Sequence, residues 1–548
     1  MIQYLDWETE FAPEEGLTLK KMTTWEYVRS TNPIVVASAD GDGPVTQQWA
    51  SPYNLSPDIC AAHNASFDAS VSREFAGHTP KLWLDTAAMV RYAISQGDLP
   101  PDSGVALANF GDKLDMEKDD MGEYVTQDVE ILRALCKKLL PRIPPEEIEL
   151  IDLHVQMASD PVLNLDSAIL EEEAESITQL AKDLRKDKNF AYLLEQLGEV
   201  PETKQTPKLT KYAFAKNDSY MKGLLVHSDE RIRWMAAARL AANSSINRTR
   251  AQRMLNTGQP FPVPLKYYGA HTGRSSGSDK LNLQNFPRGG GLRRALKAPP
   301  GHKLVICDSS QIEPRVLAYL AGQEDLLEIF RSGRDPYREF GALMYDKPAS
   351  SITALERALA KAAVLALGYG QGHKGYIRHC ATGGITVSVD DALAVVRRYR
   401  GLNADIRKYW YQLQGDVYKQ NGILRLPSGR KLIYPDLQGG QYTRATIFSK
   451  GVPQGERQTV RLWHGMITEN YVQAYARDVV MLEQTLKLAQ HWRVVLSVHD
   501  EAVMCVPEED AEECKAHAIE VFSTPPEWAA DLPVAGKAEI ADNYGTKP

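Results

Sequence analysis

Two aspartates far apart in the sequence each follow a short apolar run. Asp308 comes directly after Leu304–Cys307, and Asp500 follows Val494–Val498 with His499 between them. Such runs predict strands, and apolar residues resume soon after Asp500, which places it at the tip of a hairpin. A carboxylate at a strand end beside another at a hairpin tip would suit two divalent cations, which prefer oxygen ligands. Taken singly, each aspartate fits an ordinary helix N-cap or a polar turn equally well.

A helical segment between these aspartates predicts the substrate of such a site. Arg357, Lys361, Leu365 and Tyr369 recur every four residues, so they are expected on one helix face. Two basic side chains one turn apart suit a triphosphate, and the apolar and aromatic residues further along suit a sugar and base. Lys361 is also placed to donate a proton to a pyrophosphate leaving group. The alternative is a helix with two solvated bases and two core residues.

A second set of acids lies near the N-terminus. Asp6 and Glu8 are two residues apart in a predicted strand and would share one face. Asp68 adds a third carboxylate, while Tyr124 and Asp128, four apart, would share one helix face. Four acids can bind two divalent cations that activate water for phosphodiester hydrolysis, and Tyr124 could orient that water. Because the chain holds 71 acidic residues, the Asp-x-Glu pair alone is equally well explained as two solvent-exposed acids without a catalytic role.

In this order the N-terminal residues resemble the 3′→5′ proofreading exonuclease family. The match covers about residues 1–140 and includes an asparagine four residues before Asp68. The resemblance implies an RNase H-like fold with an active site. It assigns catalytic roles to five residues: Asp6, Glu8, Asp68, Tyr124 and Asp128. The four acids among them would also be the metal ligands.

The chain from Tyr267 to its C-terminus resembles family A DNA polymerases, and their phage replicative branch in particular. Four segments carry this resemblance: Thr272–Pro287, Asp308–Arg315, Arg357–Gly370 and Val498–Glu501. It implies a right-hand fold of palm, fingers and thumb. It also implies a DNA-dependent DNA polymerase that adds dNTPs to a primer 3′ end by two-metal phosphoryl transfer.

The resemblance carries specific roles onto this sequence. Catalytic residues would be Asp308, Asp500 and Lys361. Metal ligands would be Asp308, Asp500 and the backbone carbonyl of Ser309. Nucleotide-binding residues would be Arg357, Lys361, Leu365, Tyr369, Gln311, Glu313 and His499. DNA-binding residues would be Arg274, Asn282, Gln284, Asn285 and Gln473. Leu365 departs from the Phe or Tyr that the family usually has, so discrimination at the 3′ position of the sugar does not carry over.

Together these features predict an α/β multidomain protein. Residues 1–145 would form the exonuclease domain, 146–265 a mostly helical thumb, and 266–548 the palm, with fingers inserted at roughly 320–440. We expect no 5′ nuclease domain, because the chain begins almost at the exonuclease motif. Expected cofactors are two Mg²⁺ ions per active site, with Mn²⁺ as a substitute. Expected partners are primer-template DNA and dNTPs, with a helicase and a single-strand binding protein as replisome partners of a monomer.

Bulk properties set the remaining expectations. The net charge is −8, yet residues 266–297 hold seven basic residues and one acid, a basic strip that suits DNA locally. The six cysteines show no C-x-x-C spacing, which argues against a structural zinc site. No signal peptide and no stretch of about 18 apolar residues is present, so we expect a cytoplasmic protein without membrane contact, in the bacterial host if phage-encoded.

Two alternatives remain at this level. A single-subunit RNA polymerase shares paired aspartates with a His-Asp sequence, but Glu313 beside the incoming sugar would exclude a 2′-OH. An exonuclease with an inactive, DNA-binding polymerase-like half predicts the loss of Asp308, Asp500 or Lys361, and all three are present.

Overall fold

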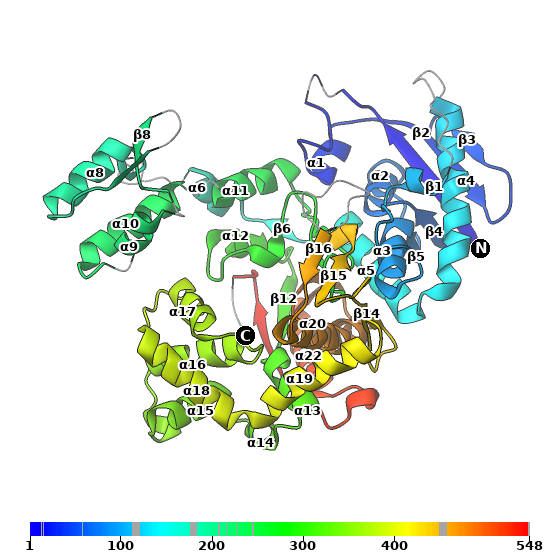
Figure 1. The fold of residues 1–548 in the computed structure, drawn as a ribbon. Coiled ribbons are helices and arrows are strands. Elements are labelled where there is room, and N and C mark those ends of the chain that lie inside the picture. The colour runs from blue at the N-terminus through cyan, green and yellow to red at the C-terminus, as the bar shows by residue number, and fades with distance from the viewer. Residues whose placement is uncertain are drawn as a thin grey trace.

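Three parts of the molecule are distinct in the computed structural model (Figure 1): an N-terminal α/β unit, a projecting helical lobe, and a larger C-terminal body. The structure describes residues 1–548 except 13, 15, 57, 112–120, 176–182, 206–208, 216–217, 226, 244–245, 449–457 and 546–548. No helix within these described ranges has both the length and the apolar character needed to span a membrane.

The N-terminal unit is built on a five-stranded sheet of order β3-β2-β1-β4-β5. Its strands are β1 (Ile2–Thr9), β2 (Pro33–Asp40), β3 (Thr46–Gln48), β4 (Ile59–Ala62) and β5 (Leu82–Asp85). β2 runs antiparallel to β1, while β4 and β5 continue the sheet in parallel. Helices α2 (Ser66–Ala76), α3 (Thr86–Gln96) and α4 (Met121–Leu139) pack around it. The strand expected to carry Asp6 and Glu8 is therefore confirmed as β1.

Helix α5 (Pro145–Ser159) joins this unit to the rest of the chain. It packs against α2 and β5 and also contacts strand β17 of the C-terminal body. The Asp152 carboxylate accepts a hydrogen bond from the Trp83 backbone N–H at 2.8 Å, and Trp25 Nε1 donates to the Ala158 carbonyl at 2.6 Å. The first part of the segment expected as thumb, residues 146–265, therefore packs on the N-terminal unit.

The projecting lobe has a hydrophobic core of its own. Its outer part consists of α8 (Asp187–Gln196), the β7–β8 hairpin (Thr203–Gln205 and Thr210–Tyr212), α9 (Ser219–Leu224) and α10 (Glu230–Asn243). Phe190, Leu194 and Met221 belong to a buried cluster that is separate from the main core. Helices α6 (Ser167–Glu175) and α11 (Ile246–Thr257) pack on each other and connect this part to the body.

The C-terminal body contains an antiparallel sheet of order β17-β18-β12-β19. Its strands are β12 (His302–Ser309), β17 (Val494–Val498), β18 (Glu501–Pro507) and β19 (Gly536–Ala541). Helix α22 (Ala511–Ser523) packs against β12 and β19. Helix α20 (His464–Arg477) continues directly into a π-helical segment, Asp478–Thr485, and then α21 (Leu486–Ala489). The strands expected before Asp308 and around Asp500 are therefore confirmed.

Among the described residues between β12 and α20, the chain forms seven α-helices. They are α13 (Ile312–Ala321), α14 (Glu324–Arg331), α15 (Pro336–Tyr345), α16 (Ala354–Leu367), α17 (His373–Thr382), α18 (Val389–Leu402) and α19 (Ala404–Lys419). The hairpins β13–β14 (Ile423–Arg425 and Lys431–Ile433) and β15–β16 (Gln441–Arg444 and Gln458–Arg461) follow them. This region covers the segment expected as fingers.

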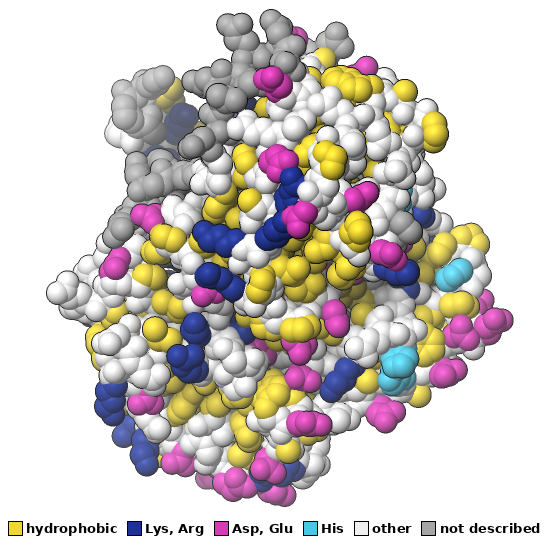
Figure 2. Space-filling model, turned by 90° about the vertical axis from the view of Figure 1, so that its right-hand side faces the viewer, with side chains coloured by type: hydrophobic (Ala, Val, Ile, Leu, Met, Phe, Trp, Pro, Cys, Tyr) yellow, Lys and Arg dark blue, Asp and Glu magenta, His cyan; other side chains and the backbone are white. Residues whose placement is uncertain are grey.

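Charge is unevenly distributed over the surface. The face seen in Figure 2 carries Lys and Arg side chains toward its centre and left, while Asp and Glu are numerous along its lower and right edges. The net charge of −8 is thus a sum over regions of opposite sign. Local basic surface is therefore compatible with an acidic protein.

One buried histidine makes stability depend on pH. His154 on α5 is 3% exposed, its Nδ1 lies 2.6 Å from the Leu150 carbonyl, and its Nε2 lies 2.5 Å from Ser275 Oγ. Burial lowers the pKa of His154 from its usual 6.5 to about 4. The ring is therefore neutral, with Nδ1–H donating to the carbonyl and Nε2 accepting from the serine.

Because this pKa is depressed in the folded state, the unfolded chain binds more protons below pH 6.5. We predict that the free energy of unfolding falls as pH drops from 6.5 toward 4, with His154 contributing up to about 1.4 kcal/mol per pH unit. Urea unfolding across this range, compared between the wild type and His154→Gln, measures the contribution. An identical pH dependence in both proteins would show that His154 does not titrate in this way.

Candidate active sites

The two aspartates of the C-terminal body lie side by side. Asp308, near the end of β12, pairs with Glu501 at the start of β18. The next residue, Ser309, donates its backbone N–H to the carbonyl of Asp500 at 2.8 Å. Glu501 is buried and accepts a hydrogen bond from the Tyr544 hydroxyl. Asp308 and Asp500 are thus brought together by strand pairing, while Glu501 is held by the C-terminal segment.

Unusual backbone conformations flank this pair. Gln311, the residue before α13, has φ of 48°, and His499, the residue before Asp500, has φ of 54°. Left-handed conformations are uncommon for residues other than glycine and cost free energy, so they persist where surrounding structure enforces them. The His499 side chain is exposed at the hairpin tip. Partial desolvation and the nearby Arg274 guanidinium lower the pKa of His499.

Arg274 joins two carboxylates at this site. Its Nη2 lies 3.2 Å from Asp500 Oδ1 and 2.8 Å from Glu313 Oε1. Removal from solvent raises the pKa of Asp500 to about 6, with Glu313 and Asp308 adding to the rise and Arg274 opposing it. The Asp500 side chain nevertheless keeps 29% of its surface exposed, so it remains accessible from the site. The carboxylates form a concentration of negative charge that one arginine only partly offsets.

Glu313 also binds Tyr369, the last of the four residues with helical spacing. The Tyr369 hydroxyl donates to Glu313 Oε2 at 2.7 Å. Helix α16 ends at Leu367, and Tyr369 lies beyond it between Gly368 and Gly370, whose φ is +72°. Tyr369 is therefore not on the helix as predicted, because the glycines end it. Burial and the Glu313 charge raise the pKa of Tyr369 well above its usual value, which keeps its hydroxyl as a donor.

Helix α16 holds the other three residues of that face. Thr353 and Glu356 form a capping box at its N-terminus. Arg357 Nε lies 2.6 Å from Asp335 Oδ2, and Lys361 Nζ lies 5.7 Å from the centre of the Tyr337 ring. Lys361 is exposed and Leu365 is half-buried. Arg357 and Lys361 therefore lie beside α15, a contact that the sequence did not predict.

The residues expected to contact DNA are distributed over two regions. Gln473 is on α20, where its Nε2 donates to Glu469 Oε1 at 3.4 Å. Desolvation and the Glu313 charge raise the pKa of Glu469, so this face of α20 borders the aspartate site. Gln284 and Asn285 belong to a 3-10 turn, Leu283–Asn285, and Asn282 immediately precedes it. The Asn285 carbonyl accepts from Arg250 Nη1 of α11 at 3.2 Å, so this segment borders the projecting lobe.

The N-terminal acids converge as predicted. Asp6 and Glu8 are both half-buried on the same face of β1, between buried neighbours. Asp68, in the first turn of α2, is 3% exposed and accepts a hydrogen bond from the Trp7 backbone N–H at 3.1 Å. Burial raises the pKa of Asp68 well above its usual value, and Glu8 adds to this. The acids therefore lie close enough to repel one another.

Tyr124 and Asp128 of α4 complete this group. Burial raises the pKa of Tyr124, and the charges of Asp128, Glu8 and Asp6 add to the rise. Tyr124 thus lies within electrostatic range of Asp6, Glu8 and Asp128, and Glu8 in turn acts on Asp68. A cavity of about 180 Å³ lies beside this unit, and Asn64, Phe67, Arg91, Lys266 and Tyr267 are among its lining residues. It spans the boundary between the N-terminal unit and the segment around β9 (Leu265–Lys266).

Neither cluster surrounds a ready-made metal site. Within the described residues, no group of three or more His, Cys, Asp or Glu side chains is arranged to hold an ion. The donors present are nevertheless carboxylate and carbonyl oxygens, which suit Mg²⁺ or Mn²⁺ rather than zinc. The raised pKa of Asp500 reflects an excess of negative charge that a divalent cation would offset. The chemistry of both clusters therefore fits divalent cations.

Several contacts at these sites gave no signal in the sequence. Arg274 was expected to contact DNA, but its pairing with Asp500 spans 226 positions. Asp335, Tyr337 and Glu469 were not singled out, because each is an ordinary polar or aromatic residue of a helix or its cap. Contacts between residues so far apart in the sequence leave no local pattern, so the spacing of residue types could not indicate them.

Known proteins are similar to this chain in sequence. The DNA polymerase family A model matches residues 162–546. The DNA polymerase of Bacillus phage SP02 is 31% identical over 279 residues, covering 46% of this chain and 43% of that protein. The thermostable DNA polymerase I of Thermus thermophilus is 29% identical over 281 residues, covering 50% of this chain and 31% of that protein. The matched segments thus span less than half of either relative.

A solved structure extends the likeness to nearly the whole fold. The POL domain of Pol1 from M. smegmatis, in complex with DNA primer-template and dNTP, superposes with a TM-score of 0.71 at 18% identity. The alignment covers 99% of this chain and 95% of that chain, so the N-terminal unit shares its fold as well. Since the family match extends over most of the chain and includes both aspartates, this protein belongs to DNA polymerase family A.

Proposed function

We propose that this chain is a DNA-dependent DNA polymerase that extends a primer 3′ end with dNTPs. The observation that carries the proposal is the Asp308–Asp500 pair, which strand pairing holds next to Arg274 and Glu313 in a family A fold. The relatives are named DNA polymerases, and the solved neighbour binds primer-template and dNTP, which supports the same substrates here.

Asp308, Asp500 and the Ser309 carbonyl would hold two divalent cations, with Mg²⁺ expected and Mn²⁺ able to substitute. Bound there, such cations supply the Lewis acidity that activates the primer 3′-hydroxyl and offsets charge on the triphosphate. Arg357 and Lys361 bind the phosphates from α16, and Lys361 donates a proton to the departing pyrophosphate oxygen. Gln311, Leu365 and His499 would border the nucleotide.

Glu313 and Tyr369 would select the sugar. The hydrogen bond between them fixes the Glu313 carboxylate, and Arg274 holds its other oxygen. A carboxylate held from both sides cannot move aside for a 2′-hydroxyl. This rigidity favours DNA synthesis over the single-subunit RNA polymerase alternative. Arg274, Asn282, Gln284, Asn285 and Gln473 would contact the DNA.

We further propose a 3′→5′ exonuclease in the N-terminal unit. The convergence of Asp6, Glu8, Asp68, Tyr124 and Asp128 supports it, as does a strand order and direction typical of RNase H-like sheets. The four acids would hold the divalent cations, and the Tyr124 hydroxyl would orient water toward the phosphodiester. In this reading residues 1–145 are the exonuclease domain, the projecting lobe is the thumb, and α13–α19 contribute the fingers.

Genome replication in a phage is the biological role that we propose, since a phage polymerase is among the similar proteins. A helicase and a single-strand binding protein would then be partners of this polymerase, working in the host cytoplasm. The chain would act as a monomer on primer-template DNA.

The two sites predict a reciprocal separation of activities. We predict that Asp500→Ala lowers primer extension by about a thousandfold or more, because several kcal/mol of transition-state stabilisation are lost. Degradation of single-stranded DNA should continue in this variant. The double variant Asp6→Ala, Glu8→Ala should show the opposite pattern. One gel with labelled primer-template or single-stranded DNA, with and without dNTPs and Mg²⁺, measures both activities.

The control for this experiment is Glu508→Ala, an exposed acid on the surface turn after β18. It should extend and degrade as the wild type does. Extension that survives in Asp500→Ala would remove the polymerase assignment from this site. Degradation that survives in the N-terminal double variant would remove the exonuclease assignment.

Sugar selection gives a further prediction. We predict that Glu313→Ala lowers the preference for dNTP over rNTP, expressed as the ratio of kcat/KM values, by about tenfold or more. The absolute extension rate should also fall, because Arg274 and Tyr369 both lose a partner. Glu313→Gln keeps the shape without the charge and should retain most of the preference. Single-nucleotide incorporation kinetics decide this, and an unchanged ratio in Glu313→Ala would refute a steric role.

A further inference from the structure

Two buried arginines hold the backbone that carries Arg274. Arg430 Nη2 donates to the Thr272 carbonyl at 3.2 Å, and Arg477 Nε donates to the Gly273 carbonyl at 3.2 Å. Gly273 has φ of +87°, and a Cβ at this position would lie 2.4 Å from Arg430 Nη1. A side chain there would collide with the guanidinium. The position of Arg274 is therefore set by contacts on its two preceding residues.

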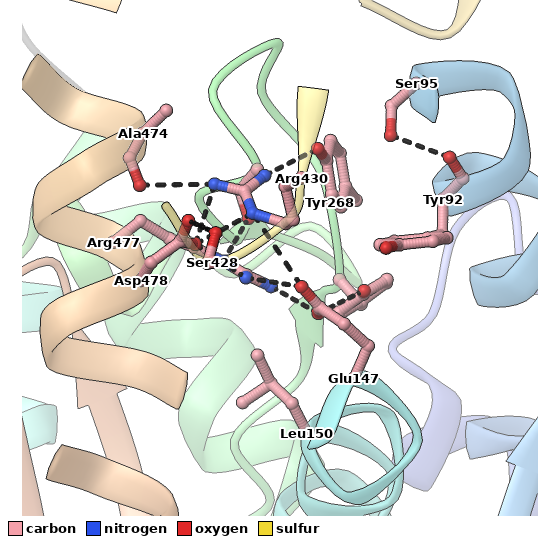
Figure 3. A network of polar contacts seen from close by, with 12 residues as sticks. Tyr92, Ser95, Glu147, Leu150, Tyr268, Ser428, Arg430, Ala474, Arg477 and Asp478 are labelled. Atoms are coloured by element: carbon pink, nitrogen blue, oxygen red, sulfur yellow. Dashed lines mark hydrogen bonds and ion pairs between the residues drawn. The ribbon is translucent and has the colours of Figure 1, made fainter. Parts of the chain in front are cut away.

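The charges of these arginines are matched by two buried acids (Figure 3). Arg477 binds Glu147 through two hydrogen bonds of 2.7 Å, and Arg430 Nε donates to Asp478 Oδ1 at 2.8 Å. The side chains of these four residues are at most 1% exposed. Burial alone would raise the pKa of Glu147, but the two guanidinium groups lower it below its usual value. Removing one partner from such a group would leave a buried charge uncompensated.

The N-terminal unit is part of this arrangement. Arg430 Nη1 donates to the Tyr268 hydroxyl at 2.6 Å, and the same hydroxyl accepts from Gln96 Nε2 at 3.1 Å. Gln96 is the last residue of α3 and is 6% exposed. Its Oε1 accepts from the Lys431 backbone N–H at 2.8 Å, next to Arg430 in the sequence. One amide thus binds both Tyr268 and the strand that begins beside Arg430.

Close packing keeps α3 against these partners. The Tyr92 and Tyr268 rings meet edge to face with centroids 5.9 Å apart. A Cβ on Gly97, which caps α3, would lie 2.9 Å from Ile433 Cδ1 of β14. The end of α3 therefore has little room to shift relative to the polymerase-like segment. Because the packing is this close, a shift of α3 would also move the residues that it contacts.

We propose that Gln96 of the N-terminal unit is a positioning residue for the polymerase site. It acts through Tyr268 and Arg430 on the Thr272–Gly273 backbone and so on Arg274, which binds Asp500 and Glu313. The inference rests on the proposed polymerase activity. It implies that the N-terminal unit supports nucleotide addition directly, in addition to any hydrolysis of its own.

The test is single-turnover incorporation of one dNTP on a saturating primer-template. Gln96→Leu removes the hydrogen bonds but keeps the size, and should lower kcat/KM for dNTP by about 3- to 30-fold. Primer-template Kd and degradation of single-stranded DNA should stay at the wild-type value. Gln96→Glu should restore activity, because its carboxylate accepts from Lys431 N–H and from the Tyr268 hydroxyl. Gln48→Leu is the matched control and should match the wild type, since the Gln48 side chain accepts the Asn54 N–H within the same unit.

A second pair of variants separates positioning from general stability. Tyr268→Phe should show the same loss as Gln96→Leu, and the double variant should lose no more than either alone. In an Arg274→Ala background, Gln96→Leu should cause no further loss. The inference is overturned if Gln96→Leu causes the same loss in the Arg274→Ala background as in the wild type, or if Gln96→Leu alone has wild-type kinetics. Either result leaves the proposed polymerase function standing. A wild-type chain that fails to extend primers overturns the proposed function and this inference with it.

Discussion

The double ion pair of Arg274 is the interaction on which the polymerase-like site depends. Asp308 comes from β12, Glu313 from α13 and Asp500 from the hairpin tip between β17 and β18, and their charges repel one another in a partly desolvated environment. Arg274 lowers that repulsion and at the same time fixes the directions of Asp500 and Glu313. Since a guanidinium stays charged at every working pH, the arrangement does not depend on a proton. Whatever fixes the Arg274 backbone therefore fixes the geometry of the site.

The N-terminal cluster meets the same repulsion differently. None of the main influences on the Asp68 carboxyl in the described structure is a basic side chain; burial, Glu8 and Asp85 raise its pKa, while backbone N–H groups lower it. Bound cations, rather than a basic side chain, would then offset the charge of such a cluster. The two groups of acids in one chain thus differ in how their charge is balanced. A cluster with its own arginine also offers that cation to a substrate.

Local features of both sites were predictable from the sequence, and so was the grouping of their acids, but the ion pairs and hydrogen bonds between distant segments were not. The apolar runs before Asp308 and Asp500 indicate strands because a buried strand consists of consecutive apolar residues. The four-residue spacing predicts the face of α16, although Gly368 and Gly370 move Tyr369 off the helix. No local pattern marks the contact of Gln96 with Lys431, which spans 335 positions. Such pairs arise only when separate units pack, and the printed sequence records nothing of that packing.

One helix supplies both Arg477 and Asp478 to the buried cluster, at the point where α20 continues into the π-helical segment. Adjacent residues on an α-helix point about 100° apart, so they seldom serve the same small site. Here the α-helix ends at Arg477 and the wider π-helical turn begins at Asp478. Arg477 binds Glu147 and the Gly273 carbonyl, while Asp478 binds Arg430 and Ser428. The two adjacent residues thus bring opposite charges to different partners within one buried cluster.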